Sequence, residues 1–250
     1  MNRRADELLV ALGIVESRAK ARAVIEEGKV FAGAKAVDKP SRKFPEGTKF
    51  EIAEGNAALR YVSRAGLKLE AALREFGISV RGLRILDAGA STGGFTDCAL
   101  QLGAEKAVCV DVGCGQLHPK LLADARVENL EKTDVRSLSP EFFGGELFDF
   151  ICADLSFISL EKTLPFLEPL LKKGAAMVCL IKPQFETDAK IMRKAGGVLR
   201  DNQTIAEAAA KITRFIQTCL PRLEIIGVVK SPILGGDGNT EYLIGLRAKS

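Results

Sequence analysis

A run of small residues between an apolar stretch and a helical pattern constrains the fold more than any other feature of this 250-residue chain. It reads Ile85-Leu-Asp-Ala-Gly-Ala-Ser-Thr-Gly-Gly-Phe-Thr96, which predicts a strand, a tight turn and the start of a helix. Small residues let the backbone approach a ligand, and the N–H groups at a helix N-terminus are open to it. The turn therefore predicts a nucleotide-type binding site, although a tight turn without a ligand has the same composition.

Strand-like and helical patterns alternate after residue 64, which predicts right-handed crossovers and a mostly parallel, doubly wound sheet. A glycine-rich turn at 234–239, with no helical pattern, separates the last two strands and predicts an antiparallel hairpin at the sheet edge. The expected strands are 84–87, 106–112, 127–130, 148–153, 175–181, 224–229 and 242–247, and the expected helices are 64–76, 95–102, 160–171 and 204–220.

The first 58 residues have a different pattern, with two short helices at 4–12 and 17–26 followed by brief strand-like pieces. We therefore expect a small α+β domain over 1–58, a linker over 59–63 and the α/β domain over 64–250.

Positive charge is concentrated in the N-terminal part of the chain. Residues 1–60 contain 12 Lys and Arg against 9 Asp and Glu, a difference of +3, whereas the whole chain has a net charge of +4. Such a segment is either a solvated helix surface or a patch that contacts nucleic-acid phosphates. The candidate RNA-contacting residues are Arg4, Arg18, Lys20, Arg22 and Lys29.

The glycine spacing in the small-residue turn favours S-adenosylmethionine over a dinucleotide. It is Gly-x-x-x-Gly-Gly rather than the G-x-G-x-x-G of dinucleotide sites, and Asp87 would repel a pyrophosphate but suit an amino group. Asp111, at the end of the second strand, can accept hydrogen bonds from both ribose hydroxyls, and Asp134, after the third strand, is placed for the adenine ring. The candidate cofactor-binding residues are Asp87, Gly89, Ala90, Ser91, Gly93, Gly94, Phe95, Asp111 and Asp134.

Four charged residues from distant parts of the chain are candidates for catalysis: Lys68, Asp154, Lys182 and Glu241. Asp154 and Lys182 follow expected strands, so they should lie at the carboxyl edge of the sheet, where ligands of such folds bind. A lysine there could deprotonate or polarise a hydroxyl group, provided that burial or another cation lowers its pKa. Which of the two lysines takes the proton remains open from the sequence.

Metal, membrane and disulfide chemistry have little support in the sequence. The six cysteines form no C-x-x-C pair and there is one histidine, so we expect free thiols in a reducing cytoplasm and no metal site. No apolar run approaches the ~20 residues of a membrane-spanning helix, and the charged N-terminus does not look like a signal peptide.

Two sets of motifs resemble known families. Ser17-Arg-x-x-Ala-Arg-x-x-Ile25 with Glu27-Gly-Lys-Val30 resembles an S4 RNA-binding domain. The whole chain resembles the TlyA family, hemolysin-like ribosomal RNA 2′-O-methyltransferases that join an S4 domain to an FtsJ-like domain. Besides the small-residue turn, the motifs are Tyr61-Val-Ser-Arg-Ala-Gly-Leu-Lys-Leu69, Val110-Asp-Val-Gly113, Asp154-Leu-Ser-Phe-Ile-Ser159, Ile181-Lys-Pro-Gln-Phe-Glu186 and Gly238-Asn-Thr-Glu-Tyr242.

This resemblance implies a Rossmann-like methyltransferase sheet, and a catalytic Lys-Asp-Lys-Glu tetrad at Lys68, Asp154, Lys182 and Glu241. It also implies S-adenosylmethionine as methyl donor and cytidine 2′-hydroxyls of ribosomal RNA, free or in ribosomal subunits, as substrate. Two other functions stay open: a membrane-acting hemolysin, suggested by the family's other name, and an RNA-binding protein with an inactive methyltransferase domain. The sequence does not say which nucleotide or which subunit is modified.

Overall fold

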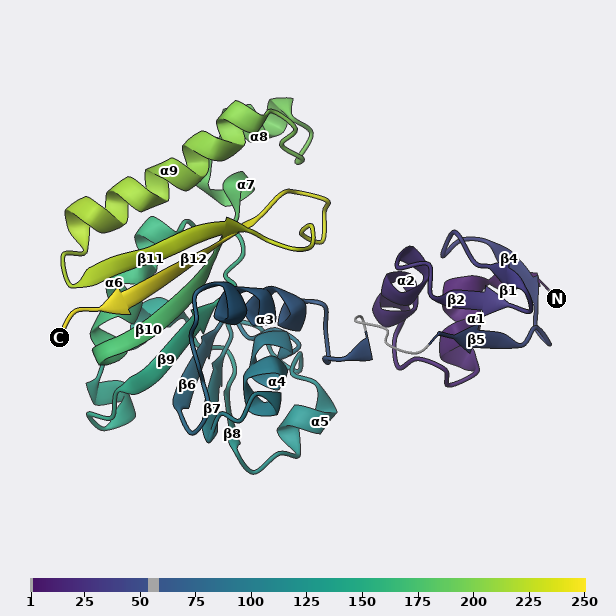
Figure 1. The fold of residues 1–250 in the computed structure, drawn as a ribbon, viewed down its shortest axis with the longest axis horizontal. Helices are drawn as coiled ribbons and strands as arrows, with labels where there is room; N and C mark the ends of the chain where they lie inside the picture. The colour runs from purple at the N-terminus through teal and green to yellow at the C-terminus, as the bar shows by residue number, and fades with distance from the viewer. Residues whose placement is uncertain (1, 54–58) are drawn as a thin grey trace. The chain divides into compact units, whose positions relative to one another are not determined.

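The computed structural model describes residues 2–53 and 59–250. The chain divides into two compact units, Met1–Arg64 and Ala65–Ser250 (Figure 1). Each unit has its own hydrophobic core, as expected of separate domains.

The N-terminal unit packs two helices beside small antiparallel sheets. Ser17 caps the second helix, accepting a hydrogen bond from the Lys20 backbone N–H, as its position in the sequence suggests. Leu8, Val24 and Val30 lie in the core of the unit. The helices are α1 (Ala5–Ala11) and α2 (Arg18–Glu26); β2 (Val30–Ala32) pairs with β3 (Lys35–Ala36) and β5 (Phe50–Ile52), and β1 (Asn2–Arg4) pairs with β4 (Lys43–Pro45). The β1–β4 pair is not predicted from the sequence.

The C-terminal unit contains a seven-stranded sheet in the order β11-β12-β10-β9-β6-β7-β8. Five neighbouring strands, from β8 to β10, are parallel, and β12 is antiparallel to both β10 and β11. The antiparallel hairpin at the edge is therefore confirmed. The strands are β6 (Arg84–Ala88), β7 (Lys106–Val110), β8 (Val127–Leu130), β9 (Phe148–Ala153), β10 (Leu171–Ile181), β11 (Leu223–Lys230) and β12 (Tyr242–Ala248).

Helices cover both faces of this sheet (Figure 1). Ile244 and Leu246 on β12 pack in one core with Ile212 of α9, whereas Gly245 between them faces the Phe76 ring beyond the end of α3, because successive strand residues point to opposite faces. The helices are α3 (Ala65–Glu75), α4 (Gly94–Gln101), α5 (Pro119–Leu122), α6 (Leu164–Leu167), α7 (Pro183–Glu186), α8 (Ala189–Lys194) and α9 (Asn202–Cys219).

The single helix expected over 160–171 is wrong. The segment forms two 3₁₀ turns, Leu160–Lys162 and Glu168–Leu170, on either side of α6. Pro165 and Pro169 explain the break, since a proline inside a helix lacks a backbone donor and clashes with the preceding turn. Strand β10 also starts earlier than expected, at Leu171, and β7 ends at Val110 rather than at residue 112.

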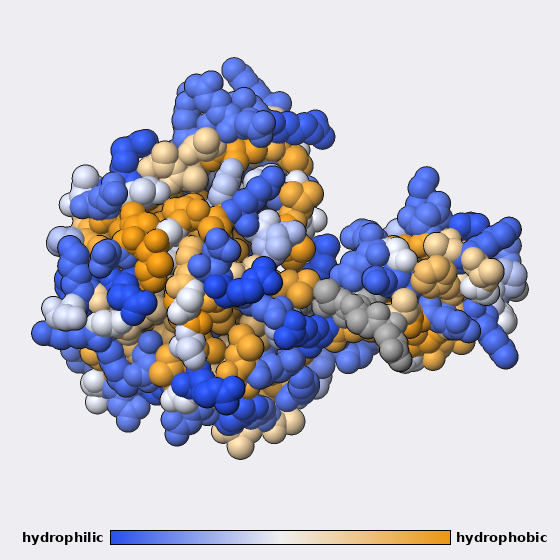
Figure 2. All heavy atoms as spheres, in the orientation of Figure 1, coloured by the Kyte–Doolittle hydropathy of each residue, from blue (hydrophilic) through white to orange (hydrophobic). Residues whose placement is uncertain are grey.

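Across residues 2–53 and 59–250, the longest helices are too short or too polar to cross a bilayer. In the view of Figure 2, hydrophilic side chains cover α8, which carries Lys190, Arg193 and Lys194.

Candidate active site

The four candidate catalytic residues meet at one edge of the large sheet. Asp154 directly follows β9 and Lys182 directly follows β10, so both lie at the carboxyl ends of parallel strands. Glu241 precedes β12, and because that strand runs antiparallel, its beginning lies at the same edge. Lys68 reaches the group from α3. The sheet topology therefore explains why Lys68 and Glu241, which are 173 positions apart in the sequence, can form a hydrogen bond.

The tetrad forms an alternating chain of charges. Lys68 Nζ donates to Glu241 Oε2 at 2.6 Å and lies 3.9 Å from Asp154 Oδ2. The other carboxylate oxygen, Asp154 Oδ1, lies 2.6 Å from Lys182 Nζ. Both lysines and Glu241 are buried, and Asp154 is largely covered. Two cations and two anions thus balance within a largely buried site, where each interaction is stronger than at the surface.

Lys182 has two further neighbours that orient its ammonium group. It donates to Ser156 Oγ at 2.7 Å, and its Nζ lies 5.9 Å from the centre of the Phe185 ring. Ser156 and Asp154 both line the cavity described next, so the two polar partners of the Lys182 ammonium group belong to its wall. Ser156 was not among the residues predicted from the sequence.

A cavity of about 450 Å³ opens beside the tetrad, at the ends of β6, β7 and β9. Its volume falls within the range of small-molecule and cofactor sites. Four predicted cofactor residues line it: Gly89, Ser91, Asp111 and Asp134. The remaining lining residues are Val110, Val112, Gln116, Thr133, Val135, Asp154, Leu155, Ser156, Phe157 and Ile158.

Asp111 organises the rim of this cavity. Its two carboxylate oxygens accept hydrogen bonds from the backbone N–H groups of Ser91, at 2.8 Å, and Gly113, at 2.7 Å. Asp134 caps the next turn and forms a bidentate pair with Arg136, which holds its pKa below the usual range. Both carboxylates are therefore fixed in place at the wall.

The glycines of the turn are required by geometry. Gly89 has φ +83°, and a Cβ there would lie 2.7 Å from the Asp154 carbonyl oxygen. Gly93 has φ +89°, and its Cβ would overlap the Leu121 side chain. A side chain at Gly89 would thus clash with the backbone after β9, and one at Gly93 would clash with a side chain of α5. Ala90, Gly93, Gly94 and Phe95 are not among the cavity-lining residues; they shape the turn and the start of α4.

Asp87 lies beneath the turn rather than on the cavity wall. It is 1% exposed, and its Oδ2 accepts from the backbone N–H of Thr96 at 3.0 Å and from Thr96 Oγ1 at 2.7 Å. Burial raises the pKa of this carboxyl to about 7, because the hydrogen bonds from Thr96 compensate only part of the lost hydration. Its predicted contact with a cofactor amino group stays a prediction.

The segment after Asp154 contains the main part of the site that sequence reasoning missed. Phe157 is 90% exposed, has φ +63°, and its ring lies 5.1 Å from that of Phe185. A positive φ is uncommon for any non-glycine residue, and more so for one with a bulky side chain. The position of Phe157, three residues after the strand-end acid Asp154, was the available signal.

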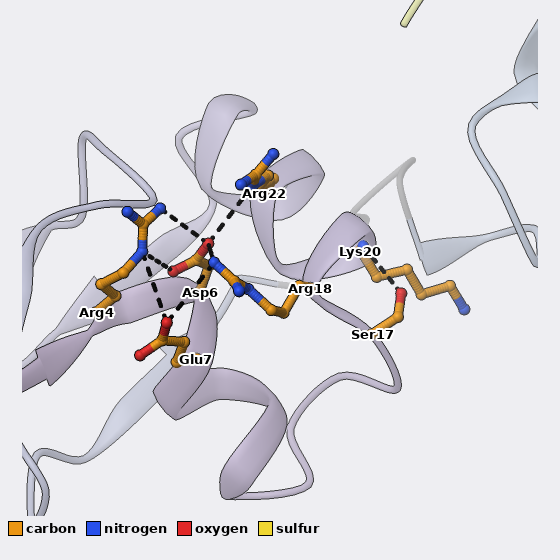
Figure 3. A network of polar contacts seen from close by, with 7 residues as sticks. All are labelled: Arg4, Asp6, Glu7, Ser17, Arg18, Lys20 and Arg22. Carbon is orange, nitrogen blue, oxygen red and sulfur yellow. Dashed lines mark hydrogen bonds and ion pairs between the residues drawn. The ribbon is translucent and has the colours of Figure 1, made fainter.

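Three of the predicted RNA-contacting residues converge on one acid. Figure 3 shows Arg4, Arg18 and Arg22 around Asp6, and the guanidinium groups of all three lie within hydrogen-bonding distance of its carboxylate. Lys20 points away from them and pairs instead with Glu16 at 3.0 Å. Lys29 follows α2 and is half-buried.

The cysteines are free thiols, four of them buried; Cys114 and Cys219 are exposed. Within the described parts of the chain, no three His, Cys, Asp or Glu side chains form a group that could hold a metal ion. His118 caps α5, accepting from the Lys120 backbone N–H, and Pro119 is the first residue of that helix.

Comparison with known proteins identifies the class that this fold and site define. Residues 61–248 match the FtsJ-like methyltransferase family and residues 3–49 match the S4 domain. The chain belongs to the FtsJ-like methyltransferase family and carries an S4 domain at its N-terminus. Its relatives narrow this class further.

The chain is 41% identical over 247 residues to the Mycobacterium tuberculosis protein named 16S/23S rRNA (cytidine-2′-O)-methyltransferase TlyA, covering 99% of this chain and 90% of that relative. It is 40% identical over 240 residues to hemolysin A of Brachyspira hyodysenteriae, covering 96% and 98%. The solved structure of a hemolysin-like protein from Streptococcus thermophilus has a TM-score of 0.76 at 38% identity, covering 100% and 89%. The chain is a member of the TlyA family.

Proposed function

We propose that this protein transfers a methyl group from S-adenosylmethionine to the 2′-hydroxyl of cytidine in ribosomal RNA. The observation that carries the proposal is the tetrad, in which Lys182 lies 2.6 Å from Asp154 beside a cofactor-sized cavity. The names of the relatives at about 40% identity support the substrate class. The target nucleotide and the ribosomal subunit are left to experiment.

The residues of the cavity fit S-adenosylmethionine. Asp111, after β7, would present a fixed carboxylate to the ribose hydroxyls. Asp134, after β8, would lie near the adenine ring. Gly89 lines the cavity, and without a Cβ it can pack closely against the Asp154 backbone at the end of β9. When bound, S-adenosylmethionine would supply a methyl group activated by a positively charged sulfur.

The tetrad would prepare the hydroxyl acceptor. A ribose 2′-hydroxyl has a pKa far above 7, so a positioned base or cation must assist its attack. Asp154 and Ser156, which line the cavity, fix the Lys182 ammonium group at 2.6 and 2.7 Å. Lys68 and Glu241 complete the charge balance behind it. We infer that Lys182 contacts the 2′-oxygen and that the other three residues set its charge and position.

RNA would be held by both units. We propose that residues 1–58 act as the S4 RNA-binding domain, that 59–63 link it to the methyltransferase domain of 64–250, and that the protein works on ribosomal RNA in the cytoplasm. Arg4, Arg18, Lys20, Arg22 and Lys29 would contact phosphates. In the methyltransferase domain the exposed Phe157 ring offers a surface on which a nucleobase can stack.

The test is the Lys182→Ala variant, with unmodified ribosomal RNA transcripts and radiolabelled S-adenosylmethionine. We expect methyl transfer to fall at least about 100-fold while the affinity for S-adenosylmethionine stays within about twofold. Lys172→Ala is the matched control, because Lys172 lies near the start of β10, at the end opposite Lys182, and pairs with Asp149. Unchanged methyl transfer by Lys182→Ala would refute the proposed role.

The same variants separate the two competing functions. Lysis of erythrocytes or liposomes that survives Lys182→Ala would favour the hemolysin named by one relative. A wild-type protein that binds RNA but shows no affinity for S-adenosylmethionine in a titration would favour an RNA-binding protein with an inactive domain.

A further inference from the structure

Asp6, in the first turn of α1, is the most enclosed charged group among the described residues of the N-terminal unit. It is 0% exposed, and its carboxylate contacts three arginines. Arg4 donates through Nε to Oδ1 at 2.9 Å and through Nη2 to Oδ2 at 3.1 Å. Arg18 reaches the same Oδ2 at 3.1 Å and Arg22 at 3.5 Å (Figure 3).

The three arginine side chains contact Asp6 and are still partly exposed to solvent. Their side chains remain 34%, 50% and 54% exposed for Arg4, Arg18 and Arg22. A guanidinium group has five N–H donors in a rigid plane, so each partly exposed arginine keeps donors that are not used on Asp6. The three cations come from the end of β1 and from two successive turns of α2, and one buried acid gathers them.

Asp6 stays ionised over the physiological range. The hydrogen bond from Arg4 is the largest cause that lowers its pKa to about 2. Together with Glu7, which lies 4.0 Å from Arg4 and 3.7 Å from Arg18, the acids cancel two of the three positive charges. A surface built only to attract RNA by charge would omit these acids, so their presence calls for another account.

We propose that Asp6 is a positioning residue, which fixes Arg4, Arg18 and Arg22 as one preorganised guanidinium surface for RNA phosphates. The proposal rests on the proposed RNA-binding function of this unit. Flexible arginines lose rotamer freedom when they bind phosphate, and arginines already held by Asp6 have less to lose. The acid thus weakens long-range attraction and strengthens short-range fit.

The Asp6→Asn variant distinguishes positioning from simple electrostatic attraction, because the two predict opposite changes in RNA affinity. The substitution adds one positive charge to the surface, so attraction alone would tighten RNA binding and steepen its salt dependence. If Asp6 positions the arginines, the affinity falls instead, and the salt dependence becomes shallower because fewer phosphates are engaged together.

The experiment uses the full chain and an unmodified ribosomal RNA transcript, with filter binding at several salt concentrations. We expect Asp6→Asn to weaken binding about tenfold, as for the loss of one or two aligned guanidinium contacts. Glu7→Gln is the matched control, since it also removes one negative charge from the cluster but lies farther from the guanidinium groups. It should bind as tightly as the wild type or more tightly. Equal or tighter binding by Asp6→Asn would overturn the proposal.

A second variant keeps the test decisive if Asp6→Asn unfolds the unit. Arg4→Lys preserves the charge but loses the two-point contact with Asp6, and we expect it to bind RNA about threefold more weakly. Hydrogen exchange of α1 and α2 checks that the unit remains folded. Unchanged RNA affinity in Arg4→Lys would count against positioning, whereas a wild-type chain that binds no RNA would refute the proposed function itself.

Discussion

Asp6 in the N-terminal unit and Asp87 in the C-terminal unit are both removed from solvent, with exposures of 0% and 1%. Their pKa values nevertheless move in opposite directions, to about 2 for Asp6 and to about 7 for Asp87. The difference lies in the donors. Asp6 accepts from guanidinium groups, whereas Asp87 accepts from the backbone and hydroxyl of one threonine, Thr96.

Burial alone does not decide the charge of an enclosed acid. Burial disfavours the ionised form in both places; the guanidinium donors of Asp6 outweigh it, whereas the neutral donors of Asp87 do not. The neighbours of Asp87 follow the same rule, since burial raises the pKa of the Cys109 thiol to about 12 and that of Cys152 well above its usual value. The cluster beneath the Gly89–Gly94 turn is thus held by neutral hydrogen-bond donors, whereas the cluster around Asp6 is ionic.

The largest expected effect is the pH dependence that Asp87 imposes on stability. The folded state keeps the Asp87 proton between pH about 4 and about 7, where the unfolded chain has released it. The contribution of this residue to the free energy of unfolding therefore falls as pH rises, by about 4 kcal/mol over that window, and is constant above it. Asp87→Asn has no such proton. Urea unfolding followed by circular dichroism should show that the free energy of unfolding of the variant rises relative to that of the wild type between pH 4 and 7.

Thr96→Val provides the control for this effect. It removes the hydroxyl donor to Asp87 and keeps the side-chain shape, so the pKa of Asp87 should rise further and the pH window should extend upward. Parallel pH curves for Asp87→Asn and the wild type would mean that Asp87 is ionised in the folded protein, and the contrast with Asp6 would disappear.

A smaller but still large effect is expected for Asp6→Ala. The variant leaves three arginines without their buried counter-charge and should lower the free energy of opening α1 and α2 by about 3 kcal/mol at pH 7. Acid should act similarly on the wild type. The folded pKa of Asp6 lies below the unfolded value, so its stabilisation is complete above pH about 4 and up to about 2 kcal/mol is lost as pH falls to about 2. Hydrogen exchange measured by mass spectrometry reports the opening at pH 7.

Glu7→Ala is the control for this comparison. Glu7 is 33% exposed and more distant from the arginines, so its loss should cost less than about 1 kcal/mol. An equal loss of stability in both variants would show that burial of Asp6 adds nothing to the effect of its charge.

The two acids also show what the sequence could and could not reveal. The strand–turn–helix around Asp87 followed from residue types alone, because small residues and apolar runs encode local structure. Whether Asp87 faces the cavity or the floor did not follow, since that depends on the strand's pleat and on Thr96 of α4. Asp6 was not singled out, because its partners Arg18 and Arg22 come from another helix.

The sequence could predict which four residues form the tetrad, but not which of them pair with each other. Strand-end positions and the family resemblance pointed to the four residues, whereas the pairing of Lys68 with Glu241 depends on the antiparallel insertion of β12 beside β10. Ser156 and Phe157 were missed because their roles depend on where the Lys182 and Phe185 side chains lie. The failed helix over 160–171 has a local cause, since two prolines outweigh its apolar spacing.

The smallest expected effect comes from Glu186, a third buried acid that tests the rule. Its carboxylate accepts from the Ser159 hydroxyl and the Leu160 backbone N–H, and Lys211 reaches only its backbone oxygen. Burial raises its pKa, so it should resemble Asp87 rather than Asp6. Because a glutamine can accept from Leu160 and donate to Ser159, Glu186→Gln should change the free energy of unfolding at pH 7 by less than about 1 kcal/mol, whereas Glu186→Ala should cost about 2 kcal/mol. A loss near 3 kcal/mol in Glu186→Gln, measured by urea unfolding, would show that the charge of the donors is not what separates these acids.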